Sequence, residues 1–237
     1  MSRAEARLVA PKGCPTVPSN FMQNIQAVLL EPVGCLADFP AAPFHEIAAQ
    51  LFGRKGKASA SASREYWHLL NLMHEAGELD AGQSRIAVAL ETEAAAEAKL
   101  YEDVRPMLEE LGSMGVAVLL ATSMSRPAAM HFLERNGIEE FFTDVATRDD
   151  AGGVKAVPLK AALHGEGITS EASIFLTDTL EGIKTARSAG AHPILMMNDP
   201  DEAQRLAGHE PDGGVVSLHE IPDFVRLVAA QNLKLHA

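Results

Sequence analysis

The chain has 237 residues, of which 47% are hydrophobic and 5% are aromatic. This length and this apolar content suffice for one sizeable α/β core with a small accessory domain, and they argue against global disorder. The formal net charge of −12 argues against a nucleic-acid partner and against binding to an anionic membrane. A local basic pocket would still bind a small anion.

The cysteines and the N-terminus indicate the compartment. Cys14 and Cys35 are the two cysteines of the chain, which is no disulfide framework and suits a reducing cytosol. No apolar run approaches the roughly 18 residues of a membrane span, and the N-terminus lacks the apolar core of a signal peptide. We therefore expect a cytoplasmic protein in which residues 1–22 form a flexible tail.

The first part of the chain predicts one strand and then a group of helices. Residues 25–30 form a short apolar run, typical of a buried parallel strand, and residues 32–40 carry the Pro, Gly and Asp of a loop. No strand pattern follows between residues 39 and 100. This stretch predicts helices at 43–53, 63–77 and roughly 83–99, the second with an apolar face made of Tyr66, Leu69, Leu70 and Met73.

From residue 103 onward, helices and strands alternate. Helices are expected at 103–112, 126–136 (with Ser125 as its N-cap), 157–166, 180–189 and 219–231, and strands at 116–121, 141–146, 172–176, 192–197 and near 214–217. Alternating units of this kind form a doubly wound parallel sheet with helices on both faces.

Polar residues come directly after three of the expected strands. Glu31, Thr122 and Asp178 each follow an apolar run. In a doubly wound sheet the ligand site lies beyond the carboxyl ends of the strands. We therefore expect these three side chains to converge at one rim of the sheet.

The segment after the first strand reads Glu-Pro-Val-Gly-Cys-Leu-Ala-Asp. It resembles the opening motif of the haloacid-dehalogenase-like hydrolases, an apolar strand followed by Asp-x-Asp-Gly-Thr-Leu-x-Asp. The glycine, the leucine and the last aspartate are in register. However, Glu31 stands where the nucleophilic Asp belongs, Val33 where the acid/base Asp belongs, and Cys35 where Thr belongs.

Three further motifs of this family follow in the expected order. Thr122 ends a strand and is followed by a helix and by Leu-Glu-Arg-Asn-Gly-Ile. Lys155 lies in Lys-Ala-Val-Pro and matches the lysine motif best, with Lys160 as the alternative. Asp178 ends an apolar strand and precedes Gly-Ile and an Ala-rich helix that stops at Ala-Gly.

The resemblance runs from about residue 25 to the C-terminus. It implies a Rossmann-like α/β core with a small helical cap inserted after the first strand. The implied domains are a core of residues 23–38 and 101–237 and a cap of residues 39–100.

The resemblance also implies roles for the motif residues. The catalytic positions are Glu31, Thr122 and Lys155; Glu31, the Val33 carbonyl and Asp178 would hold Mg²⁺; and Thr122, Ser123 and Lys155 would hold phosphate oxygens. Two of these positions are altered chemically. The extra methylene of Glu31 displaces the attacking oxygen by about 1 Å, which costs about 10²-fold in rate. Val33 carries no proton, and general acid/base catalysis is worth about 10²–10⁴-fold.

Three functions stay open. The first is a weak or non-catalytic protein that binds a small phosphorylated metabolite or another small anion, with weakened Mg²⁺ binding. The second is an active phosphatase that uses Glu31, or Asp38 as a replacement. The third is a metal-independent haloacid dehalogenase, although those enzymes also attack with Asp. Neither the substrate nor the oligomeric state follows from the sequence, and specificity is expected near Arg64, Tyr66, Trp67 and His68.

Overall fold

The computed structural model describes residues 24–197, 204–206 and 208–235. The expected tail at residues 1–22 and Cys14 lie outside these ranges. Within them, no helix combines the length and the apolarity that a membrane crossing requires.

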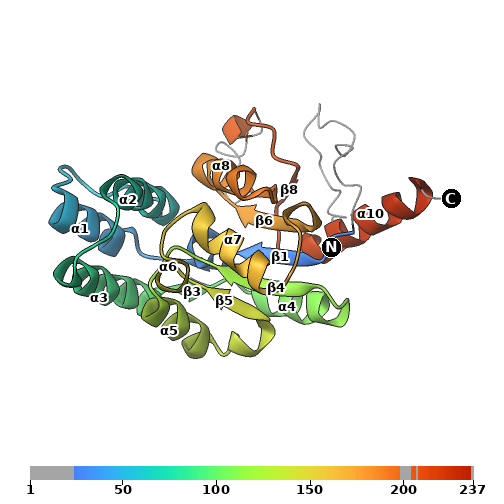
Figure 1. Ribbon diagram of the computed structural model, residues 1–237, viewed down its shortest axis with the longest axis horizontal. Coiled ribbons are helices and arrows are strands. Elements are labelled where there is room, and N and C mark those ends of the chain that lie inside the picture. The colour runs from blue at the N-terminus through green and yellow to red at the C-terminus, as the bar shows by residue number, and fades with distance from the viewer. Residues whose placement is uncertain (1–23, 198–203, 207, 236–237) are drawn as a thin grey trace, which may run out of the picture.

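A six-stranded parallel sheet forms the centre of the molecule, with the strand order β5-β4-β1-β6-β7-β8 (Figure 1). β1 lies between β4 and β6, so that Ala27 is in register with Ala117 on one side and with Ser173 on the other. All four residues of β1 are buried, as expected of an apolar strand in the middle of a parallel sheet. The doubly wound sheet is therefore confirmed. Its strands are β1 (Ala27–Leu30), β4 (Ala117–Ala121), β5 (Asp144–Ala146), β6 (Ser173–Thr177), β7 (His192–Met196) and β8 (Gly213–Val215).

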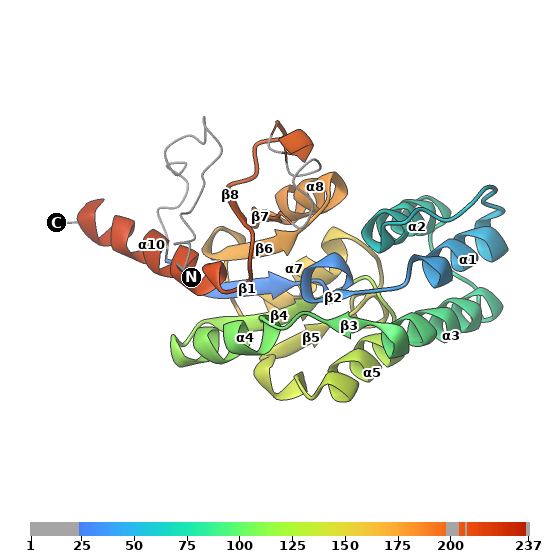
Figure 2. The ribbon, with the colours of Figure 1, turned by 180° about the vertical axis from the view of Figure 1, so that it is seen from behind.

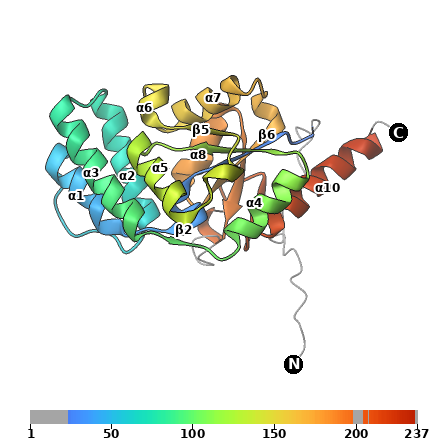
Figure 3. The same cartoon turned by 90° about the horizontal axis from the view of Figure 1, so that it is seen from below.

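Helices cover both faces of the sheet (Figure 3). Successive side chains of a strand point to opposite faces. Ala27 and Leu29 therefore belong to one hydrophobic cluster, with α7 (Ala156–Gly165) and α8 (Leu180–Ala189). Val28 and Leu30 belong to a second cluster on the other face, where the covering helices are α4 (Val104–Ser113), α5 (Arg126–Asn136) and α10 (Glu220–Leu235).

Three helices lie beyond the carboxyl ends of the strands (Figure 2). They are α1 (Ala41–Phe52), α2 (Ala62–Ala76) and α3 (Ala81–Glu97), and together we call residues 41–97 the helical segment. The expected apolar face of α2 is buried at Tyr66, Leu69, Leu70 and Met73. The chain enters and leaves this segment through two short antiparallel strands, β2 (Ala37–Asp38) and β3 (Lys99–Leu100).

Local sequence signals set the ends of these helices. The Ser61 side chain accepts a hydrogen bond from the Arg64 backbone N–H at the start of α2. Asp80 and Gln83 form a reciprocal capping box at the start of α3. Gly53 ends α1 at a φ of 67°, a conformation that glycine adopts without strain.

Three local features differ from the expectations. The expected strand at 141–146 is confined to β5, because residues Glu139–Phe141 form a 3₁₀ turn. Strand β3 and the one-turn helix α6 (Arg148–Ala151) are too short for a periodic pattern and were not expected. Ser125 is the N-cap residue of α5 as expected, although its side chain forms no capping hydrogen bond.

Candidate functional site

A tight turn carries the chain away from β1. It spans Pro32–Leu36, and Gly34 within it has a φ of 80°. A Cβ atom at Gly34 would lie 2.2 Å from Ser63 Oγ and 2.3 Å from Asp178 Oδ2. Only glycine fits here, because the backbone has a positive φ and two polar side chains fill the space that a Cβ atom would need.

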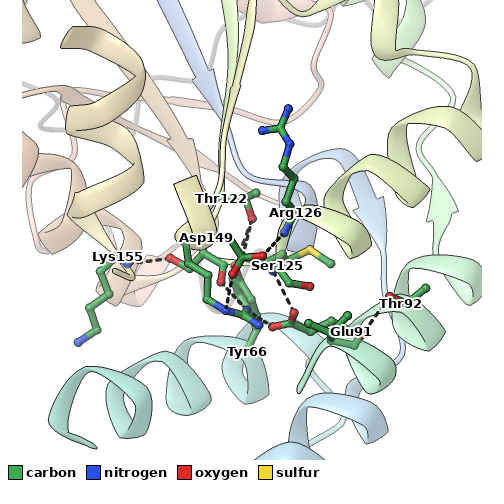
Figure 4. A network of polar contacts seen from close by, with 12 residues as sticks. Tyr66, Glu91, Thr92, Thr122, Ser125, Arg126, Asp149 and Lys155 are labelled. Atoms are coloured by element: carbon green, nitrogen blue, oxygen red, sulfur yellow. Dashed lines mark hydrogen bonds and ion pairs between the residues drawn. The ribbon is translucent and has the colours of Figure 1, made fainter. Parts of the chain in front are cut away.

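Glu31 follows β1 and is almost completely buried, with 2% of its surface exposed. The Thr122 hydroxyl donates a hydrogen bond to Glu31 Oε1 at 2.5 Å, and the Tyr66 hydroxyl donates to Oε2 at 3.2 Å. The Tyr66 and Thr122 hydroxyl oxygens are 3.3 Å apart. Glu31 and Thr122, which follow adjacent strands, are thus joined directly, and Tyr66 of the helical segment closes the group (Tyr66 and Thr122 are labelled in Figure 4).

Burial sets the protonation of Glu31. It raises the pKa of this carboxyl to about 8, because the charged form loses its hydration, and the hydrogen bonds from Thr122 and Tyr66 offset this only in part. Glu31 is therefore mostly protonated at neutral pH.

Asp178 follows β6, the other neighbour of β1. Its Oδ2 accepts a hydrogen bond from the Ser63 hydroxyl at 2.6 Å. The Cys35 thiol lies close by and donates to the Leu176 carbonyl at 3.4 Å. Burial, with the nearby charges of Asp178 and Glu31, raises the pKa of this thiol, so Cys35 is a neutral buried residue.

Glu31, Thr122 and Asp178 are therefore brought together at one rim of the sheet, as their positions at the strand ends predict. Val33 lies in the same turn with a fully buried side chain that carries no titratable group.

Lys155 and Ser123 meet through the backbone. The Lys155 N–H donates to Ser123 Oγ at 2.7 Å, and Lys155 has a φ of 63° just before α7. Its ammonium group donates to the Asn71 side chain on α2, and Figure 4 shows the side chain directed away from Thr122. The alternative lysine, Lys160, is exposed on α7.

A buried ion pair between Glu91 and Arg148, which the sequence does not predict, joins α3 to α6. Arg148 on α6 donates through Nη1 to Glu91 on α3 and to the Ser123 carbonyl, the latter at 3.0 Å. The second oxygen of Glu91 accepts the backbone N–H of Ser125 at 3.0 Å. One sequence signal existed: Arg148 comes two residues after β5, at the same rim as Glu31. Its partner lies 57 residues away on a helix whose docking no local pattern predicts.

A cavity of about 450 Å³ lies next to this ion pair rather than over Glu31. It is bounded by the end of α2, the start of α3 and the α6–α7 connection, and Arg148 contributes to its wall. Glu31, Thr122 and Asp178 do not line it.

The motif carboxylates do not fit a magnesium ion in this arrangement. Two carboxylates and a backbone carbonyl are suitable oxygen ligands for Mg²⁺. However, both oxygens of Glu31 already accept hydrogen bonds from hydroxyl groups, and so does one oxygen of Asp178.

The fold and this rim define the class of the protein. A parallel sheet of this strand order, with acidic residues after β1 and β6 and a hydroxyl after β4, is that of a Rossmann-like α/β hydrolase core. Residues 60–196 match the family model described as haloacid dehalogenase-like hydrolase, and the chain belongs to this family.

Individual relatives are distant. The chain is 25% identical over 115 residues to phosphoglycolate phosphatase of Aliivibrio fischeri, a match that covers 48% of this chain and 51% of the relative. It is 26% identical over 131 residues to pyrophosphatase PpaX of Halalkalibacterium halodurans, covering 54% and 61%. The chain thus spans roughly half the length of the curated relatives that it matches.

Solved structures show the same fold. A predicted phosphatase from Clostridium acetobutylicum has a TM-score of 0.66 at 17% identity, over 86% of this chain and 99% of the other. CbbY from Rhodobacter sphaeroides, solved in complex with phosphate, has a TM-score of 0.62 at 21% identity, over 83% and 96%.

Proposed function

We propose that this chain is a haloacid dehalogenase-like protein with weak or no hydrolytic activity, which binds a small phosphorylated metabolite or another small anion. The observation that carries this proposal is the state of Glu31, a buried carboxyl whose two oxygens accept hydrogen bonds from Thr122 and Tyr66.

A nucleophilic carboxylate must be ionised and must present a free oxygen to the phosphorus, about 3–3.5 Å away. Glu31 meets neither condition. Its pKa of about 8 keeps it mostly protonated at neutral pH, and both of its oxygens are engaged.

The general acid is missing as well. Val33 occupies its position and has no proton to transfer. Asp38, the alternative to Glu31 as the attacking carboxylate, is exposed in β2, where its backbone is in register with Lys99 of β3. We propose that Asp38 supports this ribbon, which leads to the helical segment, and does not act on a substrate. Loss of the general acid at the Val33 position is worth about 10²–10⁴-fold in rate.

The proposed anion site uses the other motif positions. We propose that the hydroxyls of Thr122 and Ser123 and the ammonium of Lys155 form the anion site, with residues 39–100 as its cap. Two relatives carry the names phosphoglycolate phosphatase and pyrophosphatase, and CbbY was solved with phosphate bound. A small phosphorylated compound is therefore the ligand class that the relatives suggest.

The proposal is tested by a substrate panel on the full chain. Phosphate release is measured from p-nitrophenyl phosphate, phosphoglycolate and pyrophosphate with and without Mg²⁺, and halide release from 2-chloropropionate without metal. We expect no release above the uncatalysed rate, together with a thermal shift in phosphate or phosphoglycolate that Thr122→Val reduces. Turnover of any panel compound at an ordinary enzymatic rate would overturn the proposal and identify the phosphatase or the dehalogenase.

A further inference from the structure

One helix supplies hydrogen-bond partners to three of the motif residues. On α2, the Ser63 hydroxyl donates a hydrogen bond to Asp178, and the Tyr66 hydroxyl donates one to Glu31. The Asn71 side chain, also on α2, accepts a hydrogen bond from the Lys155 ammonium group. All three contacts join residues far apart in sequence. The helical segment is therefore bound to the site itself and does not only cover it.

The contact at Ser63 leaves little space beside the turn. Ser63 is buried, and its Oγ and the Asp178 Oδ2 both lie within 2.3 Å of the place where a Gly34 Cβ would be. The hydroxyl thus fills the space between the turn after β1 and the carboxylate after β6.

The contact at Tyr66 is equally well supported by packing. The Tyr66 ring is fully buried, 5.2 Å from the Phe44 ring and 6.0 Å from the Trp67 ring between centroids. These neighbours fix the direction of the hydroxyl, which lies within hydrogen-bond distance of both Glu31 and Thr122.

A divalent cation and a hydroxyl donor both use the lone pairs of a carboxyl oxygen, so that one occupies the place of the other. Mg²⁺ also requires near-ideal octahedral geometry and retains several water molecules. It therefore cannot share these oxygens with side chains packed this closely.

We infer that the Ser63 and Tyr66 hydroxyls take the place of a divalent cation at Asp178 and Glu31, so that α2 is the resident occupant of the motif cleft. A cation or a phosphorylated ligand reaches the motif residues only when α2 withdraws. The inference rests on the hydroxyl contacts and goes beyond the proposed lack of turnover.

A second helix anchors the helical segment to the core. On α3, Glu91 binds Arg148 and the Ser125 N–H of the core, and both charged side chains are buried. Movement of the whole helical segment away from the core therefore requires that this pair break or that the segment pivot about it.

The chain contains its own reporter for this movement. Trp67 is the single tryptophan of the chain, next to Tyr66 on α2, and 3% of its surface is exposed. Withdrawal of α2 would hydrate the indole and shift its fluorescence to longer wavelength.

The test is Mg²⁺ binding to the full chain, read by thermal shift and by Trp67 fluorescence without any substrate. We compare the wild type with the double variant Ser63→Ala, Tyr66→Phe, which keeps the ring packing and removes both hydroxyl donors. Ser84→Ala on α3 is the control, because that serine contacts neither carboxylate in the hydrogen bonds of the described residues.

We expect no Mg²⁺ response from the wild type or from the control. The double variant should gain about 3–6 °C in Tm at Mg²⁺ concentrations roughly tenfold above its Kd. Equal stabilisation of wild type and double variant would overturn the inference, and so would a double variant with a native circular dichroism spectrum and no response.

If the double variant does not fold, Ser63→Ala alone should show the same response in smaller measure, and its failure to do so would also overturn the inference. These readouts are independent of turnover, so they separate the inference from the proposed function.

Discussion

The Thr122 hydroxyl donates to Glu31 Oε1 over 2.5 Å, and this bond joins the residues that follow the two neighbouring strands β4 and β1. A carboxyl held in this way inside the protein is a structural group at neutral pH. Its behaviour gives the first of the following predictions.

Glu31 makes stability depend on pH. Its folded pKa of about 8 lies above the ordinary value of 4.5 for a glutamate side chain, so between these values the folded state holds a proton that the unfolded state lacks. Stability therefore falls as pH rises through this window, by up to about 1.4 kcal/mol per pH unit from this group, and levels off above the folded pKa. Glu31→Gln keeps the shape and removes the titration. Urea unfolding from pH 5 to pH 8 should show the stability of Glu31→Gln rising relative to the wild type as pH increases, whereas parallel curves would contradict the buried, protonated state.

Gly34 should be intolerant of any side chain. Gly34→Ala introduces a Cβ against Ser63 Oγ and Asp178 Oδ2 at a φ of 80°, so we expect a loss of about 2–4 kcal/mol in the free energy of unfolding. The matched control is Gly53→Ala, where φ is 67° and nothing lies within 4 Å of the added Cβ. That variant should lose only about 1 kcal/mol. Equal losses in chemical denaturation would show that Ser63 and Asp178 do not press on the turn.

The ion pair between Glu91 and Arg148 should be costly to break from one side. Arg148→Met leaves the buried Glu91 carboxylate without its charged partner, and we expect a loss of about 3–5 kcal/mol. The double variant Glu91→Gln, Arg148→Met should lose clearly less than the sum of the single variants. Arg126→Met, at the exposed pair with Asp150, is the control and should change stability by less than about 1 kcal/mol. Additive single losses would mean that the pair does not couple α3 to the core.

Restoring the two aspartates should create activity. The double variant Glu31→Asp, Val33→Asp shortens the first carboxylate, which moves it away from Tyr66, and returns a group that transfers protons. We expect Mg²⁺-dependent release of phosphate from p-nitrophenyl phosphate at least about 10⁴-fold above the wild type, with α2 withdrawing when substrate and Mg²⁺ bind. Each single variant is a control and should gain far less. A folded double variant without turnover would show that these two positions are not the only obstacle.

Much of the fold follows from the sequence, because apolar runs and helical periodicity are local signals. Glu31, Thr122 and Asp178 could be nominated together, since each ends an apolar run and parallel strands end at one rim. The roles of Ser63 and Tyr66 could not, because they depend on how α2 docks on the sheet, and no local pattern encodes this. The helical periodicity places Tyr66 on an apolar face, which is correct for its ring, but its hydroxyl donates a hydrogen bond to Glu31. Lys155 was assigned to phosphate, and its contact with Asn71 likewise depends on this docking.

The most direct test of the account is whether turnover depends on Glu31. Initial rates of phosphate release from p-nitrophenyl phosphate are measured with Mg²⁺ for the wild type and for Glu31→Gln, both purified identically and checked for native circular dichroism. The account predicts the same background rate for both proteins. A wild-type rate well above background that Glu31→Gln abolishes would show that Glu31 acts as a nucleophile, and it would contradict the account.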